Sequence, residues 1–137
     1  MRYFIWAFAV ISSLGSMVAA DPASVSLRGH LRQDPGKPPV IETTDHKPIE
    51  LEGDAPTMKV LNDARLRDTD FEVDGHRVGD GHFQINGIYL PSLFVYRNGK
   101  RLQVSYWCDV CYIRTSSPGK CWCCQKDTDL DPIEPEQ

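Results

Sequence analysis

The chain has 137 residues, a length that suits one domain with one modest hydrophobic core. Its 19 acidic residues outnumber its 15 Lys and Arg residues, which gives a formal net charge of −4 at pH 7. Nucleic acids and anionic membrane surfaces attract proteins mainly through Lys and Arg, so this composition argues against both as partners.

The first 20 residues have the pattern of a secretory signal peptide. Arg2 supplies a positive charge, an uncharged and largely apolar run covers residues 3–14, and Val18-Ala19-Ala20 resembles an A-x-A cleavage site. The apolar run is shorter than the roughly 20 residues that a membrane-spanning helix needs. We therefore expect cleavage after Ala20, export to the periplasm or the extracellular space, and no stable membrane insertion afterwards. An uncleaved membrane anchor is the alternative.

The exported chain begins with segments typical of short β-strands. Residues 24–31 alternate between apolar and polar side chains, and Gly29 within them predicts a bulge or a close backbone approach. Residues 40–44 and 49–51 form two further strands around Asp45-His46-Lys47-Pro48, which predicts a hairpin.

One short helix is predicted next. Asp54 is a suitable N-cap, and Pro56 falls in the first turn, where its missing N–H has no helical partner to lose. Met58 and Leu61 lie on the apolar face of this helix.

Strands return after the helix. Residues 71–73 and 82–85 have strand patterns, and Asp74-Gly75 between them is a turn signal. Residues 93–97 and 100–107 are joined by Asn98-Gly99, which tolerates the positive φ angles of a type I′ turn and so predicts a hairpin. From residue 126 the chain is acidic and contains prolines, so residues 126–137 are predicted to be a disordered tail.

The order of these elements resembles the OB-fold, a five-stranded barrel with a helix between its third and fourth strands. The resemblance covers roughly residues 24–107 and rests on element order and on the glycine of the first strand. It implies a mainly β protein with a small OB-like barrel domain over residues 21–107. A zinc-ribbon or knuckle-like hairpin would follow over residues 108–125. Another small sandwich or roll is the alternative.

All five cysteines lie within residues 108–124. Cys108 and Cys111 form one C-x2-C pair, and Cys121 and Cys124 form another. Two such pairs are the arrangement of a zinc ribbon, in which each C-x2-C loop directs two sulfurs inward. We predict these four cysteines as metal ligands, with zinc as the metal and with iron or an iron–sulfur cluster as the alternative. Cys123 is either an alternative ligand or a free thiol.

The cysteines allow three other interpretations. Export allows disulfides, although five cysteines are an odd number and the adjacent pair is awkward to bridge. Trp107-Cys108-Asp109-Val110-Cys111 resembles the Trp-Cys-x-x-Cys of thioredoxin-like oxidoreductases, but residues 112–119 do not have the pattern of the helix that lowers the pKa of the first thiol. Covalent c-type haem requires C-x-x-C-H and is excluded, because Tyr112 and Gln125 occupy the histidine positions.

Two motifs together carry a further resemblance. Tyr-Trp-Cys-Asp-x-Cys stands at 106–111, and Gly-x-Cys-x-Cys-Cys stands at 119–124. Residues 25–124 are similar to a family of exported proteins of environmental bacteria that carry both motifs. No activity follows from this resemblance.

No pattern of catalytic residues is present, because the sequence has no Ser-His-Asp order, no glycine-rich phosphate loop and no His-Glu-x-x-His. The four histidines lack the spacing of metal ligands; they are His30, His46, His76 and His82. A run of acids at alternate positions is expected to face solvent; it consists of Asp68, Asp70, Glu72 and Asp74. We therefore predict a non-enzymatic exported binding or interaction domain, whose partner is an unidentified protein or small molecule. A thiol-based redox or metal-handling protein is the alternative.

Overall fold

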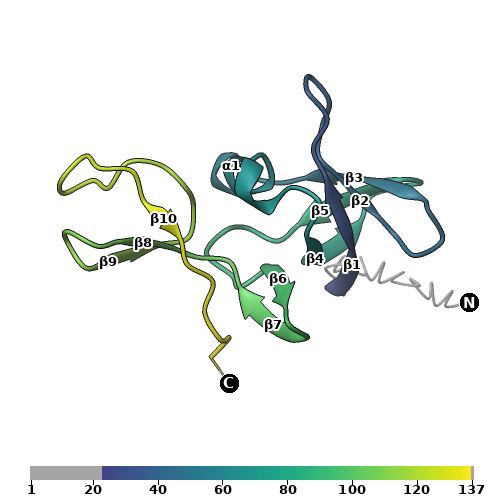
Figure 1. The fold of residues 1–137 in the computed structure, drawn as a ribbon. Coiled ribbons are helices and arrows are strands. Elements are labelled where there is room, and N and C mark those ends of the chain that lie inside the picture. Colours follow the sequence, from purple (N-terminus) through teal and green to yellow (C-terminus); the bar gives the residue numbers. More distant parts are fainter. Residues whose placement is uncertain (1–22, 137) are drawn as a thin grey trace, which may run out of the picture.

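The computed structural model describes residues 23–136 (Figure 1). The predicted signal peptide, residues 1–20, lies outside the described residues. Between residues 23 and 136, no helix combines the length and the apolar character needed to cross a membrane.

The described chain is mainly β, with one α-helix and one 3-10 turn. Its strands are β1 (Val25–Arg32), β2 (Val40–Glu42), β3 (Pro48–Glu52), β4 (Asp70–Arg77), β5 (His82–Ile85), β6 (Leu93–Arg97), β7 (Lys100–Gln103), β8 (Tyr106–Cys108), β9 (Ile113–Thr115) and β10 (Asp129–Leu130). The helix α1 spans Ala55–Leu61, and the 3-10 turn η1 spans Ala64–Leu66.

Five of the strands close a barrel. Their hydrogen-bonded order is β1-β2-β3-β5-β4, and β4 returns to pair with β1. β3 and β5 run parallel, and the other neighbouring pairs of the barrel are antiparallel. The helix α1 follows the third strand (Figure 1). The predicted fold class, a mainly β protein with a small OB-like barrel, is therefore confirmed.

The barrel core consists of the inward-facing residues of its strands. Each strand contributes at least one side chain that is at most 1% exposed, namely Leu31, Ile41, Leu51, Val73 and Phe83. Because strand side chains alternate between faces, the same alternation leaves polar residues on the outer face. The helix α1 packs its apolar face against this core.

The predicted N-cap of α1 is confirmed and has a second role. The carboxylate of Asp54 accepts a hydrogen bond from the backbone N–H of Thr57 at 2.9 Å. It also accepts one from the N–H of Ile88 at 3.0 Å, which ties the segment after β5 to the start of the helix.

Two glycines allow neighbouring strands to approach closely. A Cβ at Gly29 would lie 2.2 Å from the carbonyl oxygen of Glu42, and a Cβ at Gly75 would lie 2.0 Å from that of Gln84. The close approach predicted at Gly29 is confirmed. The turn predicted at residues 74–75 is wrong, because both residues lie inside β4, where the glycine makes room for the β5 backbone.

The predicted Asn98-Gly99 hairpin is confirmed, with φ angles of 52° and 76° at these residues. Its second strand is shorter than predicted over residues 100–107. The strand β7 ends at Gln103, and after two residues the chain enters β8, the central strand of a separate sheet with the order β10-β8-β9. In Figure 1 this small sheet stands apart from the barrel strands. The boundary predicted between residues 107 and 108 thus falls within β8.

The acidic tail is the clearest departure from the sequence prediction. Residues 126–137 were expected to be disordered, whereas residues 126–136 are ordered. The strand β10 pairs with β8, and the backbones of Ile133 and Gln103 exchange two hydrogen bonds of 3.0 and 2.8 Å. Arg114 on β9 donates to the carbonyl and carboxylate oxygens of Asp131, at 2.9 and 2.6 Å. The composition of the tail does not reveal these distant partners.

Candidate metal centre

The first C-x2-C pair forms the tip of the β8–β9 hairpin. Cys108 is the last residue of β8 and pairs with Ile113 of β9. The N–H of Tyr112 donates to the carbonyl of Cys108 at 2.9 Å, and Tyr112 has a φ of 55°. This left-handed residue reverses the chain directly after Cys111.

The second pair repeats the same turn. The N–H of Gln125 donates to the carbonyl of Cys121 at 2.9 Å, and Gln125 has a φ of 62°. The ends of this loop are held together by the N–H of Cys121, which donates to the carbonyl of Lys126 at 2.7 Å. This loop connects β9 to β10. These two strands flank the central strand β8, which carries Cys108 of the first pair.

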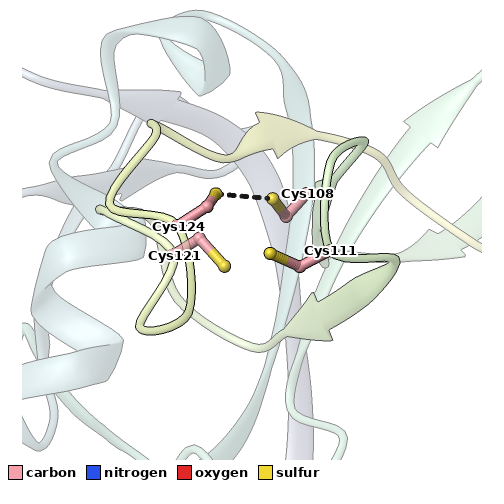
Figure 2. A group of neighbouring side chains, drawn as sticks. All are labelled: Cys108, Cys111, Cys121 and Cys124. Carbon is pink, nitrogen blue, oxygen red and sulfur yellow. Dashed lines mark hydrogen bonds between the residues drawn. The ribbon is translucent and has the colours of Figure 1, made fainter.

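The two turns bring the four predicted ligands together. Figure 2 shows Cys108 and Cys111 facing Cys121 and Cys124, with all four side chains directed into one space. The four sulfurs lie within 4.8 Å of one another, and those of Cys108 and Cys124 are 3.5 Å apart. Zinc–sulfur bonds of about 2.3 Å in a tetrahedron place the sulfurs about 3.8 Å apart. The four cysteines can therefore hold a metal ion after small side-chain movements.

Backbone groups support a thiolate at one of the four sulfurs. The N–H groups of Cys124 and Cys123 point at the sulfur of Cys121 and lower the pKa of its thiol to about 7. The thiol of Cys123 and burial raise the pKa of Cys111 in the absence of a metal, because neighbouring sulfurs disfavour a second negative charge. A bound cation would compensate that charge, since metal ligation requires deprotonated thiols.

Burial in this region is concentrated on the cysteines. Cys108 and Cys121 are each 1% exposed. Within residues 109–127, Cys121 is the one residue classed as buried, while Tyr112 and Trp122 are 77% and 74% exposed. The two turns therefore have almost no hydrophobic core of their own.

Cys123 lies outside the group of four. It is exposed, and its side chain is not among the sulfurs that lie within 4.8 Å of one another. All five cysteines are in the described part of the chain, and each is present as a free thiol. The two roles predicted for Cys123, an alternative ligand and a free thiol, stay predictions.

A polar network fixes the small sheet against the barrel. The phenol of Tyr106 on β8 is buried and donates to Asp63 Oδ2 at 3.0 Å. Arg65 donates to the same carboxylate at 2.8 Å and to the carbonyl of Thr128 at 3.2 Å. Burial alone would raise the pKa of Asp63, but the hydrogen bonds from Arg65 and Tyr106 outweigh it and lower that pKa. The connection between α1 and β4 thus holds the cysteine turns at a defined place. No local sequence pattern indicates this network, because its members lie far apart in the chain.

The thioredoxin-like interpretation lacks its structural context. Cys111 is followed by β9 and not by a helix. In thioredoxin-like proteins a helix N-terminus after the first cysteine is a common cause of its lowered pKa.

The alternating acids and the histidines noted in the sequence lie at separate places on the barrel. Of the alternating acids of β4, Asp70 is 37% exposed and lies 2.6 Å from Arg28. Glu72 departs from the expectation, because it is buried at 8% exposure with its carboxylate 2.6 Å from Arg101. One histidine, His82, lies near carboxylates that the sequence did not connect with it, because they belong to β3. The parallel β3–β5 pairing that creates this proximity could not be read from spacing.

The outer face of the barrel also carries an open pocket. It has a volume of about 530 Å³ and lies beside Gly29, between β1 and the β2–β3 loop. Arg28, His30, Thr43 and His46 contribute to its walls. Its lining side chains are all polar or charged, so it presents hydrogen-bond donors and acceptors to a bound molecule.

Comparison with known proteins gives no functional assignment. No protein-family model, no curated protein and no solved structure matches this chain.

Proposed function

We propose that this protein is an exported, non-enzymatic binding domain, in which zinc at Cys108, Cys111, Cys121 and Cys124 stabilises the C-terminal sheet. The observation that carries the proposal is the convergence of four sulfurs from two similar turns within 4.8 Å. Four soft thiolate ligands in a closed set are typical of structural zinc, because no coordination position remains for a substrate.

The energetic argument supports a structural role for the metal. Residues 109–127 bury one side chain, so the hydrophobic effect alone contributes little to their order. Metal binding in such a segment supplies folding free energy directly, since the unfolded chain has no preformed site. We therefore expect chelation to disorder the two turns before it affects the barrel.

Elemental analysis with thiol titration tests this proposal. After EDTA has removed exchangeable ions, the purified mature protein should contain one zinc per chain, with four thiols protected from modification and Cys123 reactive. Cys123→Ser is the matched control and should keep the zinc, whereas Cys121→Ser should lose it. A metal-free protein with oxidised cysteines would refute the proposal. It would also be refuted if Cys121→Ser kept the zinc and Cys123→Ser lost it.

A second candidate is a thiol-based redox or metal-handling function. Its support is the exposed thiol of Cys123 in the turn that also contains Cys121 and Cys124. Catalytic reduction of insulin disulfides by the mature protein would favour this function. A structural zinc site predicts no such activity. It also predicts that Cys123→Ser has one reactive thiol fewer than the parent protein and is otherwise the same in thiol assays.

The export component rests on residues 1–20 and has its own test. N-terminal sequencing of the protein recovered from its native host should begin at Asp21. The binding component rests on the barrel, and the net charge of −4 on the whole chain favours a protein or small molecule over nucleic acid as the partner. The pocket beside Gly29 is the surface that we propose for this partner. Binding of a labelled oligonucleotide at physiological salt would contradict this part of the proposal.

A further inference from the structure

A second group of metal-type side chains lies on the barrel, away from the cysteines. Glu50 and Glu52 project outward from β3, and His82 projects outward from β5. The two strands are parallel neighbours, with Glu50 directly opposite His82. One ligand atom from each of the three residues lies within 4.8 Å of the other two.

The imidazole of His82 has an unmet interaction at the centre of this group. Its Nδ1 is shielded from solvent and has no hydrogen-bond partner, although the ring as a whole is 44% exposed. Glu52 Oε1 is 3.4 Å away but is not aligned to accept a hydrogen bond. A shielded polar atom without a protein partner is uncommon, and a metal ion bound beside it would supply one.

The spacing of these two atoms matches two ligands of one metal ion. Metal–nitrogen and metal–oxygen bonds of about 2.0–2.1 Å in a tetrahedron separate the two donors by about 3.4 Å. The distance from His82 Nδ1 to Glu52 Oε1 is 3.4 Å. An ion between them would satisfy the shielded nitrogen and would require Glu50 to move by no more than a side-chain adjustment.

The charge around the group also differs from the rest of the barrel surface. Carboxylates on β2 and β4 each contact an arginine, in the pairs Glu42–Arg32, Asp70–Arg28 and Glu72–Arg101. Neither Glu50 nor Glu52 has a Lys or Arg partner within 4.0 Å in the described residues 23–136. Two adjacent carboxylates without a compensating charge attract a cation.

We propose that Glu50, Glu52 and His82 form a second metal site, which binds a divalent transition-metal ion such as Zn²⁺ with three protein ligands. An imidazole among the ligands favours zinc, nickel or copper over magnesium or calcium, which take oxygen ligands. Three protein ligands leave at least one coordination position open to water or to an external group. This site is therefore open to an external ligand, in contrast to the closed set of four cysteines.

Calorimetric titration with Zn²⁺ tests the second site. The protein is the tag-free mature chain with its cysteine site loaded, in a Cys123→Ser background that removes the exposed thiol. We expect one additional equivalent of Zn²⁺ to bind. His82→Ala and Glu52→Gln should each weaken this binding by at least about ten-fold, the loss typical of removing a metal ligand or its support.

His46→Ala is the matched control. His46 also contacts a glutamate, with Nδ1 2.9 Å from Glu42 Oε1, but Arg32 already neutralises that carboxylate. This variant should bind the additional Zn²⁺ as the parent does, and the imidazole ¹⁵N signals of His82 and not those of His46 should shift on Zn²⁺ addition. No additional equivalent, or binding that survives His82→Ala unchanged, would overturn the proposal.

Discussion

Replacing Asp63 by Asn should release the small sheet from the barrel at a measurable cost. The side chain of Asp63 is 7% exposed and accepts hydrogen bonds from Tyr106 and Arg65. A hydrogen bond to a buried charged group contributes about 1.5–3 kcal/mol, whereas the contact with Arg65, 43% exposed, adds little because solvent screens it. We therefore expect Asp63→Asn to lower the free energy of unfolding by about 2 kcal/mol. That loss corresponds to a decrease in melting temperature of about 6–8 °C for a domain of this size.

The pH dependence of this loss has a defined sign. The pKa of Asp63 is lowered in the folded state, so its contribution is fully present above the unfolded value of about 3.9. It is lost as the pH falls through the lower folded-state pKa. Denaturant unfolding of both proteins should therefore show a constant difference from about pH 5 upward and a shrinking one below about pH 4.

Asp127→Asn is the matched control for this experiment. Its side chain is 82% exposed in a pair with Lys120, so its replacement should change stability by less than about 0.5 kcal/mol. Loss of the proposed zinc at low pH would affect parent and variant alike and would cancel in their difference. An Asp63→Asn variant as stable as Asp127→Asn, or a difference that persists undiminished to about pH 2, would refute the reasoning.

Three other perturbations have expected outcomes. Gly75→Ala should unfold the barrel, or lower its stability in thermal unfolding by more than about 3 kcal/mol, because the new Cβ would lie 2.0 Å from a backbone carbonyl oxygen. Gly87→Ala is the control and should be close to neutral, because its Cβ would lie 3.5 Å from the nearest atom. Arg114→Ala removes the hydrogen bonds to Asp131 and should speed amide hydrogen exchange in β10 while leaving the barrel strands protected; equal protection in both proteins would contradict the assigned contacts. Chelation of zinc should abolish the dispersed amide signals of residues 106–130 before those of β1 to β5, and simultaneous loss of both sets would show that the barrel depends on the metal equally.

Local signals in the sequence were sufficient for most of the barrel. Alternation predicted β1 and β5, Asp54 predicted the helix start, and Asn98-Gly99 predicted the β6–β7 hairpin, because each of these depends on residues close together in the chain. Gly75 shows the limit of such signals. A glycine after an aspartate favours a turn, but here its missing side chain is required where β4 crosses β5.

Long-range pairing explains the remaining differences. The tail has the composition of a disordered segment, yet β10 is held by β8 and by Arg114, and neither partner can be inferred from the tail itself. The four cysteines could be grouped from sequence because their spacing defines two turns. The group around His82 could not, because a parallel pairing between β3 and β5 brings it together.

The zinc K-edge X-ray absorption spectrum of the mature protein, after EDTA has removed exchangeable ions, tests the central claim most directly. A metal held by Cys108, Cys111, Cys121 and Cys124 predicts a single shell of four sulfur atoms at about 2.3 Å. A shell that contains nitrogen or oxygen, or a protein without zinc whose cysteines are oxidised, would contradict the four-cysteine centre.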